Sequence, residues 1–226
     1  MQKETNQKRS GKKGLTIVLS VLVGILVIIG VLTALMFNDP NISKMNSKIT
    51  PSDEFTKKIL TASVTGAESS ATADEVNSFL EGRRLENNTI SSGHGLTINR
   101  IIVSFREDNT ADAYLPVEFK TKHFGVSVHF TPSYDAASGQ LVMHVLAVKI
   151  GQLPVNPEWL FAYFKEILPS EFSIKGTDIQ INASIFKLTY AGVTAELKIS
   201  NLRIEKGLLK VKAKSNLNIP LLGITS

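Results

Sequence analysis

The pattern of apolar and polar positions divides the chain into one unbroken apolar run and a long alternating region. From Leu15 to Phe37 no residue carries a charge, and sixteen of the 23 positions are Leu, Ile, Val or Phe. A helix of that length spans roughly 34 Å, slightly more than the roughly 30 Å hydrocarbon core of a bilayer. The run therefore predicts a transmembrane helix over residues 15–37.

A cleaved secretory signal is the competing interpretation of an apolar run near the N-terminus. Such signals have a core of about 7 to 15 residues and a small-x-small cleavage site, whereas Asn38-Asp39-Pro40 follows this run. We therefore expect an uncleaved signal anchor that crosses a cell membrane once. Five Lys/Arg precede the run and three lie in the 20 residues after it, which favours a cytoplasmic N-terminus and an extracellular C-terminal domain.

Four regions follow from this assignment. We expect a cytoplasmic basic tail at 1–14, the transmembrane helix at 15–37, a polar connector at 38–50 and an extracytoplasmic β-rich domain at 51–226. The last region is long enough to bury one substantial core. Within the apolar run, small residues gather on one helical face, which permits a weak homodimer through the transmembrane helix.

Helical signals precede the alternating region. Residues 51–58 indicate a short helix or turn, and 58–65 indicate a strand. The segment Thr72-Ala73-Asp74-Glu75 then has the spacing of a capping box, in which the threonine hydroxyl and the glutamate carboxylate each accept a backbone amide. It predicts a short helix that Gly82 helps to end.

From Leu96 onward the dominant period is two, as expected for strands. Val126, Val128 and Phe130 alternate with polar residues, so one face of the strand is dry and the other is wet. Pro116 interrupts a similar run and indicates an edge or a bulge. Turn signals separate the runs at 107–109, 135–139 and 205–207. This pattern predicts a long antiparallel meander.

One helical element interrupts the meander. Asn156-Pro157-Glu158 provides an N-cap, a first-turn proline and an acid near the positive end of a helix, and Pro169 provides the stop. Apolar residues cover one broad face, with Trp159 and Tyr163 at its margins. The helix either fills the concave face of the sheet as ordinary core or lines the mouth of an apolar groove, because Trp and Tyr suit sites that are apolar at one end and wet at the other.

Charge and cysteine content restrict the function further. Outside the tail and the apolar run, 20 Lys/Arg face 19 Asp/Glu, so nothing predicts a nucleic-acid partner. The chain contains no cysteine, which excludes disulfides and thiolate metal sites. An extracytoplasmic domain that folds without disulfides suits a bacterium.

The order of parts resembles the YpmS-like family of Gram-positive bacterial membrane proteins. The resemblance rests on the anchor, the Ala73-Asp74-Glu75-Val76-Asn77-Ser78-Phe79-Leu80 helix, the meander, and Gly151-Gln152-Leu153-Pro154-Val155-Asn156-Pro157 opening a second helix. The arrangement is also similar to the tubular lipid-binding superfamily. It implies an α+β fold in which an N-terminal transmembrane helix precedes one long, curved antiparallel β-meander packed against one or two helices, with a groove for acyl chains.

Candidates for lining that groove come from the sheet and from the second helix. From the sheet we take Phe119, Val126, Val128, Phe130, Leu146, Ala147 and Val148. From the helix we take Trp159, Leu160, Phe161 and Phe164.

A search for catalytic chemistry returns nothing specific. The four histidines form no metal-binding helical pair, and His129 and His144 are expected on solvated strand faces. We therefore expect no cofactor, no metal site, no catalytic residue and no enzyme activity. Two functions remain. The chain is either an anchored module that binds a lipid or a lipid-linked envelope component, or a scaffold subunit that recruits an envelope enzyme.

Overall fold

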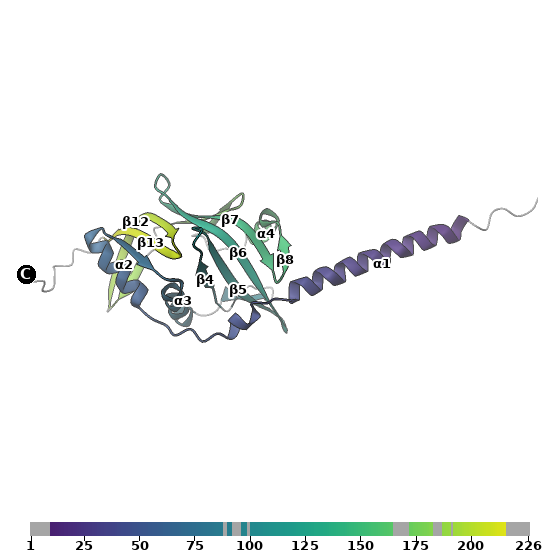
Figure 1. Ribbon diagram of the computed structural model, residues 1–226, viewed down its shortest axis with the longest axis horizontal. Helices are drawn as coiled ribbons and strands as arrows, with labels where there is room; N and C mark the ends of the chain where they lie inside the picture. Colours follow the sequence, from purple (N-terminus) through teal and green to yellow (C-terminus); the bar gives the residue numbers. More distant parts are fainter. Residues whose placement is uncertain are drawn as a thin grey trace, which may run out of the picture.

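The computed structural model describes residues 10–87, 90–91, 96–98, 100–164, 172–182, 187–190 and 192–215. An apolar N-terminal helix, α1 (Ser10–Phe37), leads into a domain of two curled antiparallel sheets flanked by helices (Figure 1). The fold class is α+β with an N-terminal apolar helix, as the sequence pattern predicted.

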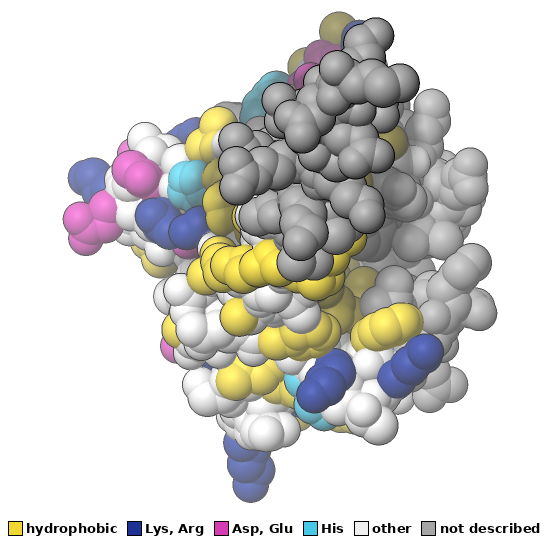
Figure 2. Space-filling view, turned by 90° about the vertical axis from the view of Figure 1, so that its right-hand side faces the viewer, with side chains coloured by type: hydrophobic (Ala, Val, Ile, Leu, Met, Phe, Trp, Pro, Cys, Tyr) yellow, Lys and Arg dark blue, Asp and Glu magenta, His cyan; other side chains and the backbone are white. Residues whose placement is uncertain are grey.

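Helix α1 exposes apolar side chains on all of its faces. Ten Val, Leu and Ile side chains between Val21 and Leu32 are exposed, which is typical of a helix that lies in lipid and not in a protein core. Among the residues that the structure describes, it is the helix long and apolar enough to cross a membrane. Figure 2, viewed from the side on which α1 emerges, shows apolar side chains at the centre with basic and histidine side chains around and below them.

The first sheet pairs the last described strands with a strand early in the domain, and it lies at the end of the domain away from α1 (Figure 1). Its strand order is β1 (Glu68–Ala71), β13 (Leu208–Ser215), β12 (Val193–Glu205) and β11 (Lys187–Tyr190). Helix α2 (Glu54–Thr65) packs against β13, and the buried Ile59 lies in one cluster with Leu197 and Val211. This cluster is the core between the first sheet and its helix.

Helix α2 shows that the strand predicted at 58–65 is wrong. The buried residues of α2 are Thr56, Ile59 and Ser63, which recur at helical spacing. Two of the three are polar, so the pattern of apolar residues did not reveal the buried stripe. The αL residue Gly66 follows the helix, and the amide of Ala67 bonds to the carbonyl of Ala62 at 3.0 Å, as in a glycine C-cap.

Helix α3 (Ala73–Asn87) begins at the predicted capping box. The Glu75 amide donates to Thr72 Oγ1 at 3.2 Å, and the Thr72 amide donates to Glu75 Oε2 at 2.9 Å. The helix does not end near Gly82, however, and continues to Asn87. Glu81 precedes this glycine directly and forms ion pairs with Arg84, three residues further along α3, and with Arg100. The pair with Arg84 spans the glycine and supports the helix there.

The second sheet carries the central strands. Its order is β2 (Ile90–Ser91), β3 (Leu96–Ile98), β5 (Ala111–Phe119), β6 (Lys122–Asp135), β7 (Gln140–Ile150), β10 (Asp178–Asn182) and β9 (Phe172–Lys175), with β4 (Ile102–Phe105) on β5 and β8 (Leu153–Val155) on β7. The expectation of one continuous meander is therefore wrong. β13 pairs with β1, which precedes the alternating region, and β11, β12 and β13 form a separate sheet with it.

Local signals within the second sheet are confirmed. The turn residues Asn109 and Gly139 have φ of 68° and 67°, as tight turns require. Pro116 pairs with Gly125 of β6, and on its other side it lies between the segments of β5 that pair with β4 and with β3. The residue without an N–H therefore occupies the gap between two ladders.

The two sheets and helix α4 (Pro157–Phe164) meet in a second apolar cluster. Phe130 and Val148 of the second sheet, Ile204 of β12 and Leu160 of α4 are all buried in it. Asn156 caps α4, because the Glu158 amide donates to Asn156 Oδ1 at 2.8 Å. The stop predicted at Pro169 lies outside the described residues.

Candidate functional site

Six of the eleven groove candidates come together in the second cluster. Phe130, Val148, Leu160 and Phe161 are buried there, and Val126 and Val128 pack against them. Val148 is only 2% exposed, so these side chains contact one another closely. The sheet face that the alternation predicted to be dry is therefore the face covered by α4 and by β12 of the first sheet.

A β-bulge separates the neighbouring candidates on β7. His129 pairs with Ala147, but Phe130 pairs with Val145, so Leu146 is an extra residue on β7. The bulge directs Val145 and Val148 to the core, and Leu146 is left 56% exposed beside the exposed Ala147. Of the three consecutive candidates on β7, Leu146 and Ala147 therefore do not face the second cluster, and Val148 does.

Three further candidates lie elsewhere. Phe119 is exposed at the far end of β5, next to the turn that leads to β6, and so does not line the cluster. Trp159 is 63% exposed on α4. Phe164 is the last residue of α4, and its side chain lies outside the described residues.

The strands of the second sheet contact the end of α1. We define the anchor junction as residues 35–39 together with Gly125 and Gly151. The Gln152 amide donates to the Leu35 carbonyl at 2.9 Å, and the Gly151 amide donates to the Gly125 carbonyl at 2.8 Å. A Cβ on Gly151 would lie 2.2 Å from the Met36 carbonyl oxygen. The last turn of α1 thus lies directly on the turn between β7 and β8.

Asp39 holds the other side of the anchor junction. The Tyr114 hydroxyl donates to Asp39 Oδ2 at 2.6 Å, and the Asn41 amide donates to Asp39 Oδ1 at 2.8 Å. Both side chains are buried, and a Cβ on Gly125 would collide with both of them. Burial, together with the hydrogen bond to Asp39, raises the pKa of Tyr114 above its ordinary value. The Phe37 and Phe124 rings pack edge to face at 5.9 Å.

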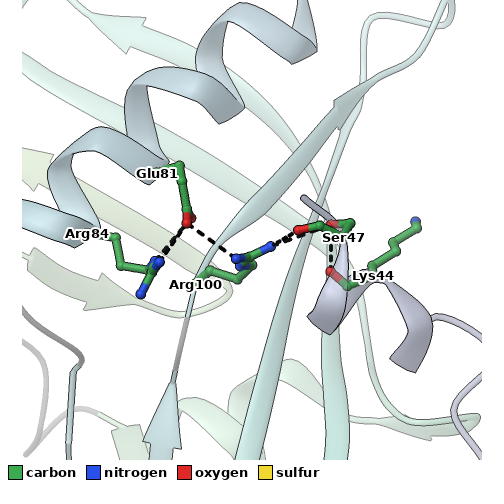
Figure 3. Close-up of polar contacts among 5 residues, drawn as sticks. All are labelled: Lys44, Ser47, Glu81, Arg84 and Arg100. Atoms are coloured by element: carbon green, nitrogen blue, oxygen red, sulfur yellow. Dashed lines mark hydrogen bonds and ion pairs between the residues drawn. The ribbon is translucent and has the colours of Figure 1, made fainter. Parts of the chain in front are cut away.

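The connector predicted at 38–50 is tied to the domain by a polar network (Figure 3). It contains a short 3-10 helix, η1 (Ile42–Asn46), which contacts β5 and β6. Arg100 donates from Nη1 to the Ser47 carbonyl at 2.6 Å and from Nη2 to Glu81 Oε1 at 3.3 Å. Arg84 binds both carboxylate oxygens of the buried Glu81. The network therefore connects α3 to the segment that follows the anchor.

Glu81 makes this network sensitive to acid. The hydrogen bonds from Arg84 and the charge of Arg100 hold the pKa of Glu81 below its ordinary value. Its contribution to stability is therefore present above the ordinary carboxyl pKa of about 4.3 and is lost as pH falls through the lower folded pKa. We expect Glu81→Gln to lower the thermal midpoint at about pH 7 and the difference from wild type to shrink towards about pH 3. Glu107→Gln, in an exposed turn, is the control and should leave the midpoint unchanged. A difference between Glu81→Gln and wild type that does not depend on pH would contradict the acid sensitivity of the network.

A second polar arrangement escaped the sequence reasoning. His144 lies between two side chains on neighbouring strands, with Ser133 Oγ 3.1 Å from Nε2 and Asp178 Oδ1 3.0 Å from Nδ1. The order of groups is that of a serine hydrolase triad. Here it lies on an outward sheet face with His144 exposed, and Ser133 belongs to a strand whose backbone pairs with β7. We therefore interpret the arrangement as a hydrogen-bonded chain across three strands.

The junction residues were missed for a physical reason. Gly125 and Gly151 are separated from the anchor by about a hundred residues, and a glycine between strands otherwise indicates only a turn or bulge. A partial signal was present in the Gly151-Gln152-Leu153-Pro154 segment, which the sequence analysis treated only as a loop before the helix.

Comparison of the chain with protein-family models, with curated proteins and with solved structures finds no match.

Proposed function

We propose that this chain is a membrane-anchored, non-catalytic binding module that holds an acyl chain of a lipid or of a lipid-linked envelope component. In this proposal α1 crosses the membrane once, the N-terminus is cytoplasmic and the domain is extracellular. The excess of Lys and Arg before the apolar run supports this orientation. A phosphatase fused after Ser226 tests it, because the enzyme is active only outside the cell.

The observation that carries the proposal is the position of the anchor relative to the second cluster. The end of α1 contacts β6, β7 and β8. The inner faces of β6 and β7, with α4 directly after β8, form that apolar cluster. An anchored domain therefore presents this part of its curled sheet next to the bilayer. A lipid leaving the membrane would have a short path to the cluster, with the exposed Trp159 at its margin.

The same cluster provides the argument for the alternative. Val148, Phe161 and Ile204 are each less than a tenth exposed and pack in one group, as they would in a closed core. A closed core favours the second function, a scaffold subunit that recruits an envelope enzyme. The two functions differ in whether the interior takes up a ligand.

Lipid content and a filler variant separate the two functions. We expect the full chain, extracted in mild detergent, to carry lipid in native mass spectrometry. Val128→Phe adds bulk on the inner face and should reduce the bound lipid severalfold, because it occupies the volume that an acyl chain requires. Ala147→Phe adds a comparable ring on the outward face, one strand away, and should leave the lipid in place.

The opposite result would point to the scaffold. Wild-type protein that is free of lipid in several mild detergents would contradict the binding module. In that case we expect Val128→Phe to cost about 1 to 3 kcal/mol of stability as simple overpacking, which thermal unfolding would detect.

A further inference from the structure

The turn between β5 and β6 lies on the anchor side of the domain. We define the β5–β6 tip as residues 119–123. Phe119 pairs with Lys122, so Lys120 and Thr121 form a two-residue turn. Phe124, which follows the tip directly, packs against Phe37 at the end of α1. In Figure 1 the ends of β5 and β6 lie beside the domain end of α1.

The path of the chain after the anchor shows which way the tip faces. Phe37 packs at the level of Phe124, and Asp39 then reaches Tyr114, which pairs with Ser127. The chain that leaves the membrane thus runs along β6 away from the tip. The tip lies in the opposite direction along the strand, roughly 7 to 10 Å beyond Phe124 at about 3.3 Å per residue. The headgroup layer adds about 5 to 8 Å to each side of the hydrocarbon core, so the tip is within reach of that layer.

The composition of the tip suits phospholipid headgroups. Its five side chains are exposed: one aromatic ring at Phe119, two cations at Lys120 and Lys122, and His123 and Thr121. It contains no acidic residue. The Lys120 ammonium lies 5.4 Å from the centre of the Phe119 ring, so apolar surface and positive charge are presented together. Ammonium groups attract lipid phosphates, and an aromatic ring prefers the interface.

The backbone conformation of the turn is one in which lysine is unfavourable. Lys120 has φ of 56°, a left-handed conformation for which glycine or asparagine is preferred in two-residue hairpin turns. A residue kept in an unfavourable conformation points to a role for its side chain. Here that side chain is a cation on the side of the domain from which α1 emerges.

We propose that the β5–β6 tip is a second membrane contact, in which Phe119 enters the interface and Lys120 and Lys122 bind lipid phosphates. The anchor junction supplies the rigid connection that keeps the tip at the surface. This inference rests on the membrane anchoring in the proposed function, and it adds a lipid surface as a partner of the folded domain itself.

Site-directed spin labels test the contact, and the absence of cysteine allows single cysteines to be introduced without background. The full chain would be reconstituted in vesicles of phosphatidylglycerol and phosphatidylcholine. Nitroxides would be placed at Thr121→Cys in the tip, at Ala137→Cys in the exposed β6–β7 turn, and at Leu26→Cys in α1. Collision with a water-soluble nickel chelate reports exposure to water, and collision with oxygen reports exposure to lipid.

Each outcome has one meaning. We expect the Leu26 label to contact lipid, the Ala137 label to contact water and the Thr121 label to be shielded severalfold from the nickel chelate relative to Ala137. A Leu26 label in water would overturn the anchoring in the proposed function. A Leu26 label in lipid together with a Thr121 label as exposed as Ala137 would overturn the second contact alone.

Charge reversal identifies the chemistry of the contact. Lys120→Glu with Lys122→Glu should remove the shielding of the Thr121 label in these vesicles, since each lysine near an anionic surface changes the bound population by roughly fivefold. Lys212→Glu with Lys214→Glu, exposed on β13, changes the net charge equally and should leave the shielding intact. Equal loss in both variants would overturn the proposal, and circular dichroism would verify that each variant is folded.

Discussion

Gly151→Ala will weaken the connection between α1 and the domain more than substitution of any other described glycine with a positive φ. Gly151 has φ of +59°, and an added Cβ would lie 2.2 Å from the Met36 carbonyl oxygen and 2.7 Å from that of Leu35. The left-handed conformation costs about 1 to 2 kcal/mol for alanine, and overpacking adds about 1 to 3 kcal/mol. We expect the thermal midpoint of the full chain in detergent to fall by roughly 5 to 15 °C.

Gly176→Ala is the matched control for this substitution. Gly176 has φ of +62° in the turn between β9 and β10, and a Cβ there meets nothing within 4 Å. The control therefore carries only the conformational cost, and its midpoint should fall by roughly 2 to 8 °C. Trypsin should also cleave Gly151→Ala faster than the control at Lys44 and Lys48, which follow the anchor. Equal midpoints and equal cleavage in the two variants would contradict a close contact between Gly151 and the last turn of α1 at the anchor junction.

Asn77→Leu will destabilise the domain through two unpaired backbone groups. Nδ2 of the Asn77 side chain donates to the Val103 carbonyl at 2.9 Å, and Oδ1 of the same side chain accepts a hydrogen bond from the Val103 backbone amide at 2.7 Å. The side chain is 8% exposed and acts on β4 as a neighbouring strand would. Leucine has a similar size but leaves both groups unbonded, at about 1 to 3 kcal/mol for each one that stays away from water. We expect a loss of about 2 to 4 kcal/mol in denaturant unfolding.

Hydrogen exchange at Val103 separates this effect from a simple change of polarity. The Val103 amide should exchange much faster in Asn77→Leu than in wild type. Asn46→Leu changes an exposed asparagine and should stay within about 0.5 kcal/mol of wild type. Unchanged protection of Val103 in the Asn77 variant would show that the amide has another partner.

Features that depend on neighbouring residues were predictable from the sequence. The capping box joins residues three positions apart, the N-cap of α4 joins Asn156 to Glu158, and the apolar run that forms α1 is continuous. These contacts depend on local geometry alone, which the order of residues determines. Strand alternation likewise placed Val126, Val128 and Phe130 on the inner face.

Features that depend on distant partners were not predictable in this way. The amide of Asn77 could not be assigned to Val103, nor the carboxylate of Asp39 to Tyr114, because 26 and 75 residues separate them. The bulge at Leu146 has no distinctive residue, so the sequence did not show that Val148 faces the second cluster while Leu146 and Ala147, chosen with it as groove candidates, are exposed. The division into two sheets followed from the pairing of β1 with β13, between the first and last strands of the domain.

The anchor junction connects the domain to α1 without a flexible linker. The apolar run is slightly longer than a typical hydrocarbon core is thick, and a helix in that position adapts to a thinner bilayer by tilting. A flexible linker would absorb such a tilt. Here the Gln152 amide bonds to the Leu35 carbonyl and the Tyr114 hydroxyl bonds to Asp39. In the proposed membrane-spanning arrangement, a change in membrane thickness would therefore rotate the domain over the membrane surface.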